Sequence, residues 1–78
     1  MNKYTIKFKA ICPVNNDVIE YTLIIESSQM IEVENIKDAV NECNIGFHEK
    51  FADLLHSKFG GHQVMTAIHD GVLIETIR

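Results

Sequence analysis

One segment near the middle of the chain constrains the fold more than any other. Over Gly46–Phe59 the apolar residues recur at intervals of three and four, the spacing of one face of an α-helix. That face carries five large side chains, Phe47, Phe51, Leu54, Leu55 and Phe59. Charged residues such as Glu49 and Lys58 occupy the other side. Because such a helix is stabilised mainly by burial of its apolar face, we expect it to cover a sheet that the flanking segments form.

Two segments before this helix alternate apolar and polar residues, as half-buried β-strands do. The first is Tyr4–Ala10 and the second is Val18–Glu26. The side chains expected to face the core are Tyr4, Ile6, Phe8 and Ala10 in the first, and Ile19, Tyr21, Leu23 and Ile25 in the second. Pro13 ends the first run because it lacks a backbone donor, and Val14–Asp17 has the composition of a turn. The two runs therefore predict a hairpin.

Three further elements complete the predicted order. The residues at helical spacing before the central segment are Val33, Ile36, Val40 and Cys43. They predict a first helix that begins near Glu34. Gln63–His69 and Val72–Ile77 predict two more strands, joined by Asp70-Gly71, a strong two-residue hairpin signal. The sequence thus predicts one α+β domain over residues 1–78, of order ββααββ, with two helices on one face of a four-stranded antiparallel sheet.

Length and charge exclude several functional classes. A chain of 78 residues has room for one modest core. Its net charge of −4 argues against general nucleic-acid binding. No signal peptide and no apolar run long enough to cross a bilayer can be recognised, so we expect a cytoplasmic protein without membrane contact.

The histidines and cysteines do not have the spacing of metal ligands. His48-Glu49 would open a zincin motif, but Ala52 stands where the second histidine is required. There is no His-x-His and no Cys-x-x-Cys, and the two cysteines fit no disulfide framework. We therefore predict no metal site.

Cys12 has two interpretations. It stands where the first strand passes into a loop, five residues before Asp17. There it is either an exposed nucleophile whose proton is handled by a neighbouring carboxylate, or a small buried apolar residue. Cys43, on the apolar face of the first predicted helix, is expected in the core.

The residues at the two helix starts also have two interpretations. Glu32 lies between Ile31 and Val33, just before the first helix, and His48-Glu49 opens the second. These side chains either complement the helix dipole or recognise a substrate. A carboxylate in an apolar setting accepts paired N–H donors from a guanine-like heterocycle.

Three short segments, in this order of elements, resemble a known family. They are Ala10–Pro13 with Asp17 downstream, Ile31–Val33 followed by Ile36-Lys37, and Phe47–Glu49. In the same order, the nitrile reductases of the tunnelling-fold (T-fold) superfamily have a Cys-Pro segment, a Val-Glu-Ser segment and a Phe-His-Glu segment. That QueF-like family reduces 7-cyano-7-deazaguanine in queuosine biosynthesis, a tRNA modification. The resemblance spans nearly the whole chain.

The resemblance implies roles for seven residues. Cys12 would attack the nitrile to give a thioimide, and Asp17 would be the proton donor. The residues that would hold the deazaguanine are Ile31, Glu32, Val33, His48 and Glu49. It also implies a purine- or pterin-like ligand, a homo-oligomer with sites between subunits, and NADPH as reductant.

The chain departs from the family in the cofactor segment. Of the family's basic run only Lys37 remains, and Glu34 stands where a dinucleotide phosphate needs a base. His69-Asp70-Gly71 replaces an Arg-Gly-Gly segment of the family. Two alternatives to an NADPH-dependent reductase therefore stay open. One is an amidinotransferase-type relative that converts the nitrile into an amidine with ammonia. The other is a non-catalytic, homo-oligomeric binding module that keeps the fold.

Overall fold

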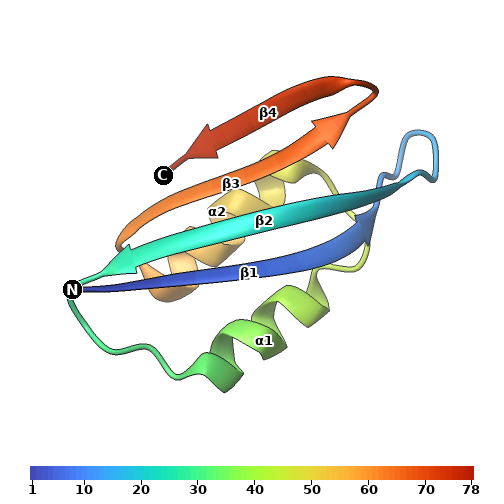
Figure 1. Cartoon of the computed structure of the whole chain (residues 1–78). Coiled ribbons are helices and arrows are strands. Elements are labelled where there is room, and N and C mark those ends of the chain that lie inside the picture. Colours follow the sequence, from blue (N-terminus) through green and yellow to red (C-terminus); the bar gives the residue numbers. More distant parts are fainter.

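Four strands and two helices follow one another in the predicted order (Figure 1). The computed structural model describes all of residues 1–78. Its elements are β1 (Asn2–Ile11), β2 (Val18–Ser27), α1 (Val33–Glu42), α2 (His48–Phe59), β3 (His62–His69) and β4 (Val72–Ile77). The strands form one antiparallel sheet in the order β1-β2-β3-β4. The predicted ββααββ order and four-stranded antiparallel sheet are confirmed.

The core lies between the sheet and the two helices. Every strand residue predicted to face inward on β1 and β2 is buried or packs against the buried cluster. The largest fully buried side chains are Tyr21, Leu23, Ile25, Leu55, Met65 and Cys43. They come from the sheet, from α2 and, at Cys43, from the residue after α1. Because α1 buries Ile36, Ala39 and Val40 in the same cluster, both helices cover the same face. The core position predicted for Cys43 is confirmed, since it is 2% exposed.

The apolar face of α2 is narrower than predicted. Phe51 and Leu55 are buried with Ala52, but Phe47 is 53% exposed and Leu54 is 43% exposed. Phe47 is the residue before the helix, with an extended backbone at φ −90°, so helical spacing does not place its side chain. Leu54 lies on the flank of the helix, beyond the reach of the sheet. The expectation that both lie on the core-facing side was wrong.

The connection between the helices fixes the start of α2 beside the end of β1. Ile11 donates its N–H to the Asn44 carbonyl at 2.8 Å, and Gly46 donates to the Ile11 carbonyl at 3.2 Å. Gly46 passes close to Phe51, since an added Cβ would lie 2.8 Å from the ring. This short parallel bridge brings the loop after Ile11 next to the first turn of α2.

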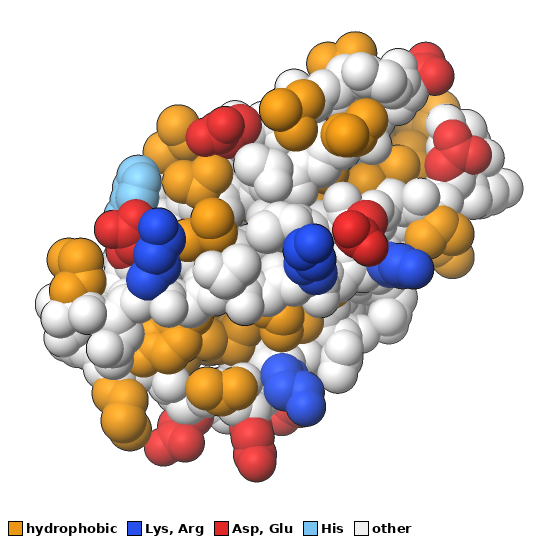
Figure 2. Space-filling model, viewed as in Figure 1, with side chains coloured by type: hydrophobic (Ala, Val, Ile, Leu, Met, Phe, Trp, Pro, Cys, Tyr) orange, Lys and Arg blue, Asp and Glu red, His pale blue; other side chains and the backbone are white.

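The other face of the sheet has no helix over it. Figure 2 shows it with lysine side chains along β1 and apolar side chains over the hairpin of β3 and β4. Among the exposed apolar residues there are Val18, Ile68 and Leu73, which line a shallow hollow. The sheet order also leaves β1 and β4 as edges, apart from the Ile11–Ile45 bridge.

Candidate functional site

A cleft of about 640 Å³ opens where the end of β1, the start of α2 and the β3–β4 hairpin meet. Nine residues line it, among them Cys12, Phe47, His48, Glu49, His69 and Ile74. Pockets for small molecules are commonly of this size. Three of the seven residues named from the sequence, Cys12, His48 and Glu49, thus share one cleft.

His48 is the buried member of a histidine pair. It is 6% exposed, and its Nε2 lies 3.2 Å from the Met65 carbonyl oxygen. Its Nδ1 lies 3.2 Å from Nε2 of His69. A carbonyl only accepts, so Nε2 of His48 carries the hydrogen. Burial lowers the pKa of His48, which keeps the ring neutral and leaves Nδ1 to accept from His69.

Tyr21 supports both histidine rings from the sheet. Its ring meets His48 edge to face with centroids 5.3 Å apart, and meets His69 at 5.9 Å. It also packs against Phe8 and Phe51. Because these aromatic contacts hold the rings from several sides, the histidine pair has a defined orientation at the floor of the cleft.

Cys12 is half-buried and packs against the core from the rim of the cleft. Its N–H donates to the backbone carbonyl of Asp17 at 2.8 Å, and Asn16 donates back to the Cys12 carbonyl at 2.9 Å. This turn holds Asp17 beside Cys12 along the chain. The Asp17 carboxylate itself is exposed and does not line the cleft.

One arginine forms ion pairs with two carboxylates at the other side of the cleft. Arg78 Nε donates to Asp53 at 2.8 Å, and its Nη2 lies 3.4 Å from Glu49. Both carboxylates are largely exposed. Glu49 therefore keeps a free carboxylate oxygen at the mouth of the cleft, while Arg78 balances its charge.

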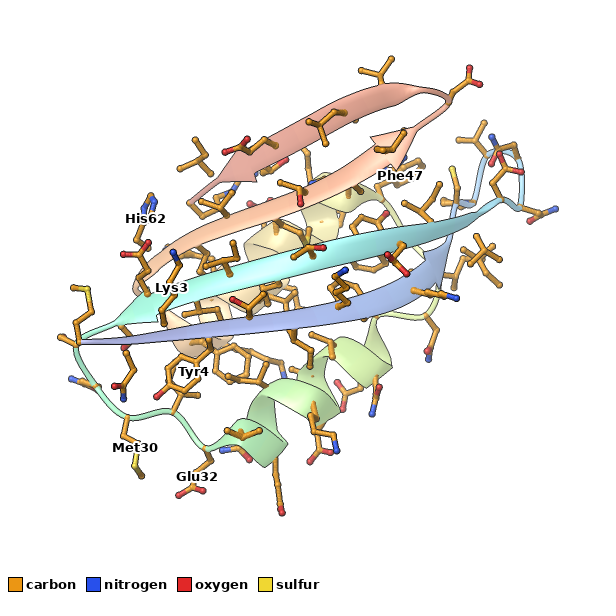
Figure 3. All side chains as sticks on the ribbon, in the orientation of Figure 1. Lys3, Tyr4, Met30, Glu32, Phe47 and His62 are labelled. Carbon is orange, nitrogen blue, oxygen red and sulfur yellow. The ribbon has the colours of Figure 1, made fainter.

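The remaining three predicted residues lie elsewhere. Ile31, Glu32 and Val33 stand at the start of α1, and Figure 3 shows Glu32 and Phe47 at opposite ends of the molecule. Ile31 is held by its N–H, which donates to the Tyr4 hydroxyl at 2.9 Å. Glu32 is exposed, and its side chain makes no capping hydrogen bond to the start of α1. Within one chain, Ile31, Glu32 and Val33 are therefore separate from the cleft.

The cleft includes residues that the sequence did not single out. His69, Asp53 and Ile74 line it, although none was considered as a site residue. For His69 a signal existed. It lies two residues beyond Ala67 on one strand, so the alternation of the strand turns it toward the helices.

The arrangement has no group of three or more histidine, cysteine or acidic side chains placed to hold a metal ion. None of the helices has the length and apolar character needed to span a bilayer.

Comparison with known proteins identifies the fold. The crystal structure of an archaeosine synthase QueF-Like, in its apo form, matches with a TM-score of 0.69 at 19% sequence identity. The match covers 99% of this chain and 89% of that one. No family model matches the sequence, and no curated protein does. The chain therefore has the T-fold, and its overall structure is similar to that of a QueF-like protein.

Proposed function

We propose that this chain binds a purine-like heterocycle bearing a nitrile, of the 7-cyano-7-deazaguanine class, and attacks it through Cys12. One observation carries the proposal. A half-buried thiol shares a cleft of about 640 Å³ with an ordered histidine pair and a carboxylate, which suits a polar heterocycle. The structural likeness to an archaeosine synthase supports the same class of substrate.

The chemistry is redox-neutral at the first step. The Cys12 sulfur forms a bond to the nitrile carbon, one π pair of the C≡N bond moves to nitrogen, and the thiol proton ends on that nitrogen. The product is a thioimide. By the family resemblance Asp17 is the proton donor, and its backbone bond to Cys12 keeps it within the same turn. His48 and Glu49 hold the heterocycle from the start of α2.

A second subunit completes the site in this proposal. Glu32 lies at the opposite end of the molecule from the cleft. In this proposal Ile31, Glu32 and Val33 therefore reach a ligand in the cleft only from a neighbouring copy. The edges at β1 and β4 are open, and antiparallel pairing between copies would bury them. Association between copies also buries apolar surface that a chain this short cannot bury alone.

Ammonia fits the second step better than NADPH. The first turn of α1 carries Glu34, which repels a dinucleotide phosphate, and Lys37 is the single cation of that helix. Ammonia needs no such site. It adds to the thioimide carbon, the C–S bond breaks, and an amidine leaves with Cys12 restored as a thiol.

The direct test is adduct formation with cyano-deazaguanine. Wild-type protein should gain the mass and ultraviolet absorbance of a thioimide, and Cys12→Ala should not. Cys43→Ala is the matched control, because its thiol is buried and should leave adduct formation intact. Wild-type protein that binds the compound without any covalent mass would contradict the enzyme proposal and favour the non-catalytic binding module.

Subunit mixing tests where the site lies. Cys12→Ala lacks the nucleophile and Glu32→Gln lacks the carboxylate proposed to come from the partner. Neither homo-oligomer should form adduct, but mixed oligomers contain some sites with both wild-type residues and should recover part of the activity. Absence of recovery in verified mixed oligomers would contradict a shared site. A protein that sediments only as a monomer at micromolar concentration would contradict it as well.

A further inference from the structure

One polar atom in the cleft has no role in the chemistry above. Nδ1 of His69 has no hydrogen-bond partner within the chain, whereas its Nε2 is engaged with His48 at 3.2 Å. His69 is half-buried and lines the same cleft as Cys12. A free ring nitrogen on a residue that lines the same cleft as a candidate nucleophile is a group that can accept a proton.

The hydrogen bonds of the histidine pair can run in only one donor-to-acceptor direction. The Met65 carbonyl can only accept, so His48 donates to it from Nε2. Since burial holds His48 neutral, its Nδ1 has a lone pair and must accept from Nε2–H of His69. In neutral His69 the hydrogen is thereby fixed on Nε2. The lone pair is fixed on Nδ1, the nitrogen without a partner.

The sheet places His69 across the cleft from Cys12. His69 lies two residues beyond Ala67 on β3, and Cys12 two residues beyond Ala10 at the end of β1; both alanines are buried. Neighbouring strands are about 4.8 Å apart, so the backbones of β1 and β3 are separated by about 10 Å. Ala67 pairs with Tyr21 and Tyr21 pairs with Phe8, so Cys12 also lies two residues farther along the sheet than His69. A carbon bound to Cys12 would lie in the cleft that the His69 ring also lines.

We propose that His69 is the general base of the second step, in which ammonia displaces Cys12 from the thioimide. This role rests on the proposed function. Ammonia forms a bond to the thioimide carbon while Nδ1 of His69 takes one of its protons. The C–S bond then breaks, and the proton passes from Nδ1 to the departing sulfur. No oxidant or reductant is consumed, and His48 is the positioning residue that fixes the His69 tautomer.

Several charged or titratable groups surround this pair. They are Cys12 from the end of β1, Tyr21 from β2, Glu49, Lys50 and Asp53 from α2, and Arg78 after β4. Arg78 is paired with both Asp53 and Glu49, so its single positive charge leaves one net negative charge on the three side chains.

The test is single-turnover kinetics on His69→Gln. Glutamine can still donate to His48 but has no basic nitrogen. We expect the variant to form the thioimide with cyano-deazaguanine and to accumulate it, because its release by ammonia should slow by about 100-fold or more. His62→Gln, at the exposed start of the same strand, is the matched control and should release product normally.

Two results would overturn the role of His69 without touching the proposed function. One is release by His69→Gln at the wild-type rate. The other is a His69 tautomer with its hydrogen on Nδ1, read from imidazole nitrogen shifts in NMR spectra of the unmodified protein, which requires no variant to fold. If the wild-type protein forms no adduct, that result contradicts the proposed function itself, and with it the role of His69.

Discussion

The starts of the two helices are alike in sequence and different in surroundings. Each has an acidic residue in its first turn, an extended residue before it and no side-chain cap. At α2, however, the first helical residue is His48, which is buried against β3 and pairs with His69. At α1 the corresponding residue is Val33, which is 59% exposed. In this chain the cleft forms at the helix start against which another strand ends.

The difference has a simple structural cause. The bridge between Ile11 and Ile45 draws the start of α2 under the end of β1, and β3 ends above it. The start of α1 lies instead against the first half of β1, where the Ile31 N–H donates to the Tyr4 hydroxyl. One end therefore contains a cleft with a thiol and two imidazoles, and the other presents a carboxylate to solvent, which suits a contribution to a neighbouring subunit.

The largest expected contrast is between the two thiols. Cys12 lines the cleft, whereas Cys43 is 2% exposed and its Sγ lies 3.5 Å from the Ala39 carbonyl. Burial also raises the pKa of Cys43, which lowers its thiolate content. With limiting iodoacetamide, Cys12 should react about 100-fold faster than Cys43. That ratio corresponds to a free energy of about 3 kcal/mol for the local opening that would expose Cys43 to the reagent. Mass mapping that finds Cys43 labelled first would contradict the catalytic role of Cys12.

A second prediction compares two phenylalanines at the start of α2. Phe51 is 6% exposed and contacts Phe8 and Tyr21, so Phe51→Ala should cost about 3–5 kcal/mol of unfolding free energy. Phe47 is exposed, and Phe47→Ala should change stability by less than about 0.5 kcal/mol. Urea denaturation measures both. Equal losses would mean that Phe47 is covered, as by a partner subunit.

A third prediction concerns pH. Because burial lowers the pKa of His48 in the folded state, the unfolded chain binds a proton there more readily. The neutral, buried His48 therefore contributes fully to stability above about pH 6.5. This contribution is lost as the pH falls from there toward the lower pKa that His48 has in the folded state. Denaturation midpoints measured from pH 7.5 down to pH 5 should fall less steeply in His48→Gln than in wild type. His62→Gln should keep the wild-type slope, and an unchanged slope in His48→Gln would contradict the assignment.

The smallest effect is expected at the arginine on the rim of the cleft. Arg78 pairs with Asp53 and Glu49, but both carboxylates are largely exposed. Asp53→Asn should therefore cost at most about 1 kcal/mol, and less in high salt. Denaturation at low and high sodium chloride gives the measurement. A loss several times larger would show that the pair is shielded in the assembled protein.

The sequence alone determined the elements and their order. Alternation with a period of two identified the strands, and Asp70-Gly71 marked a turn in which both residues have positive φ, at 50° and 82°. The inward side chains of β1 and β2 were predicted correctly for the same reason, because alternation needs no knowledge of distant residues. Helical spacing was less reliable along α2, where Phe47 precedes the helix and is 53% exposed and Leu54, in the middle of the helix, is 43% exposed.

Only the tertiary structure decided what lies in the cleft. His48 was noticed for its motif, but its partners Met65 and His69 are 17 and 21 residues away, and no local pattern specifies such a pair. The separation of Glu32 from Cys12 likewise depends on two antiparallel helices whose starts point to opposite ends. Periodicity fixes which face a residue occupies, because that depends on its neighbours in sequence. Which residues meet across that face depends on how the strands and helices pack.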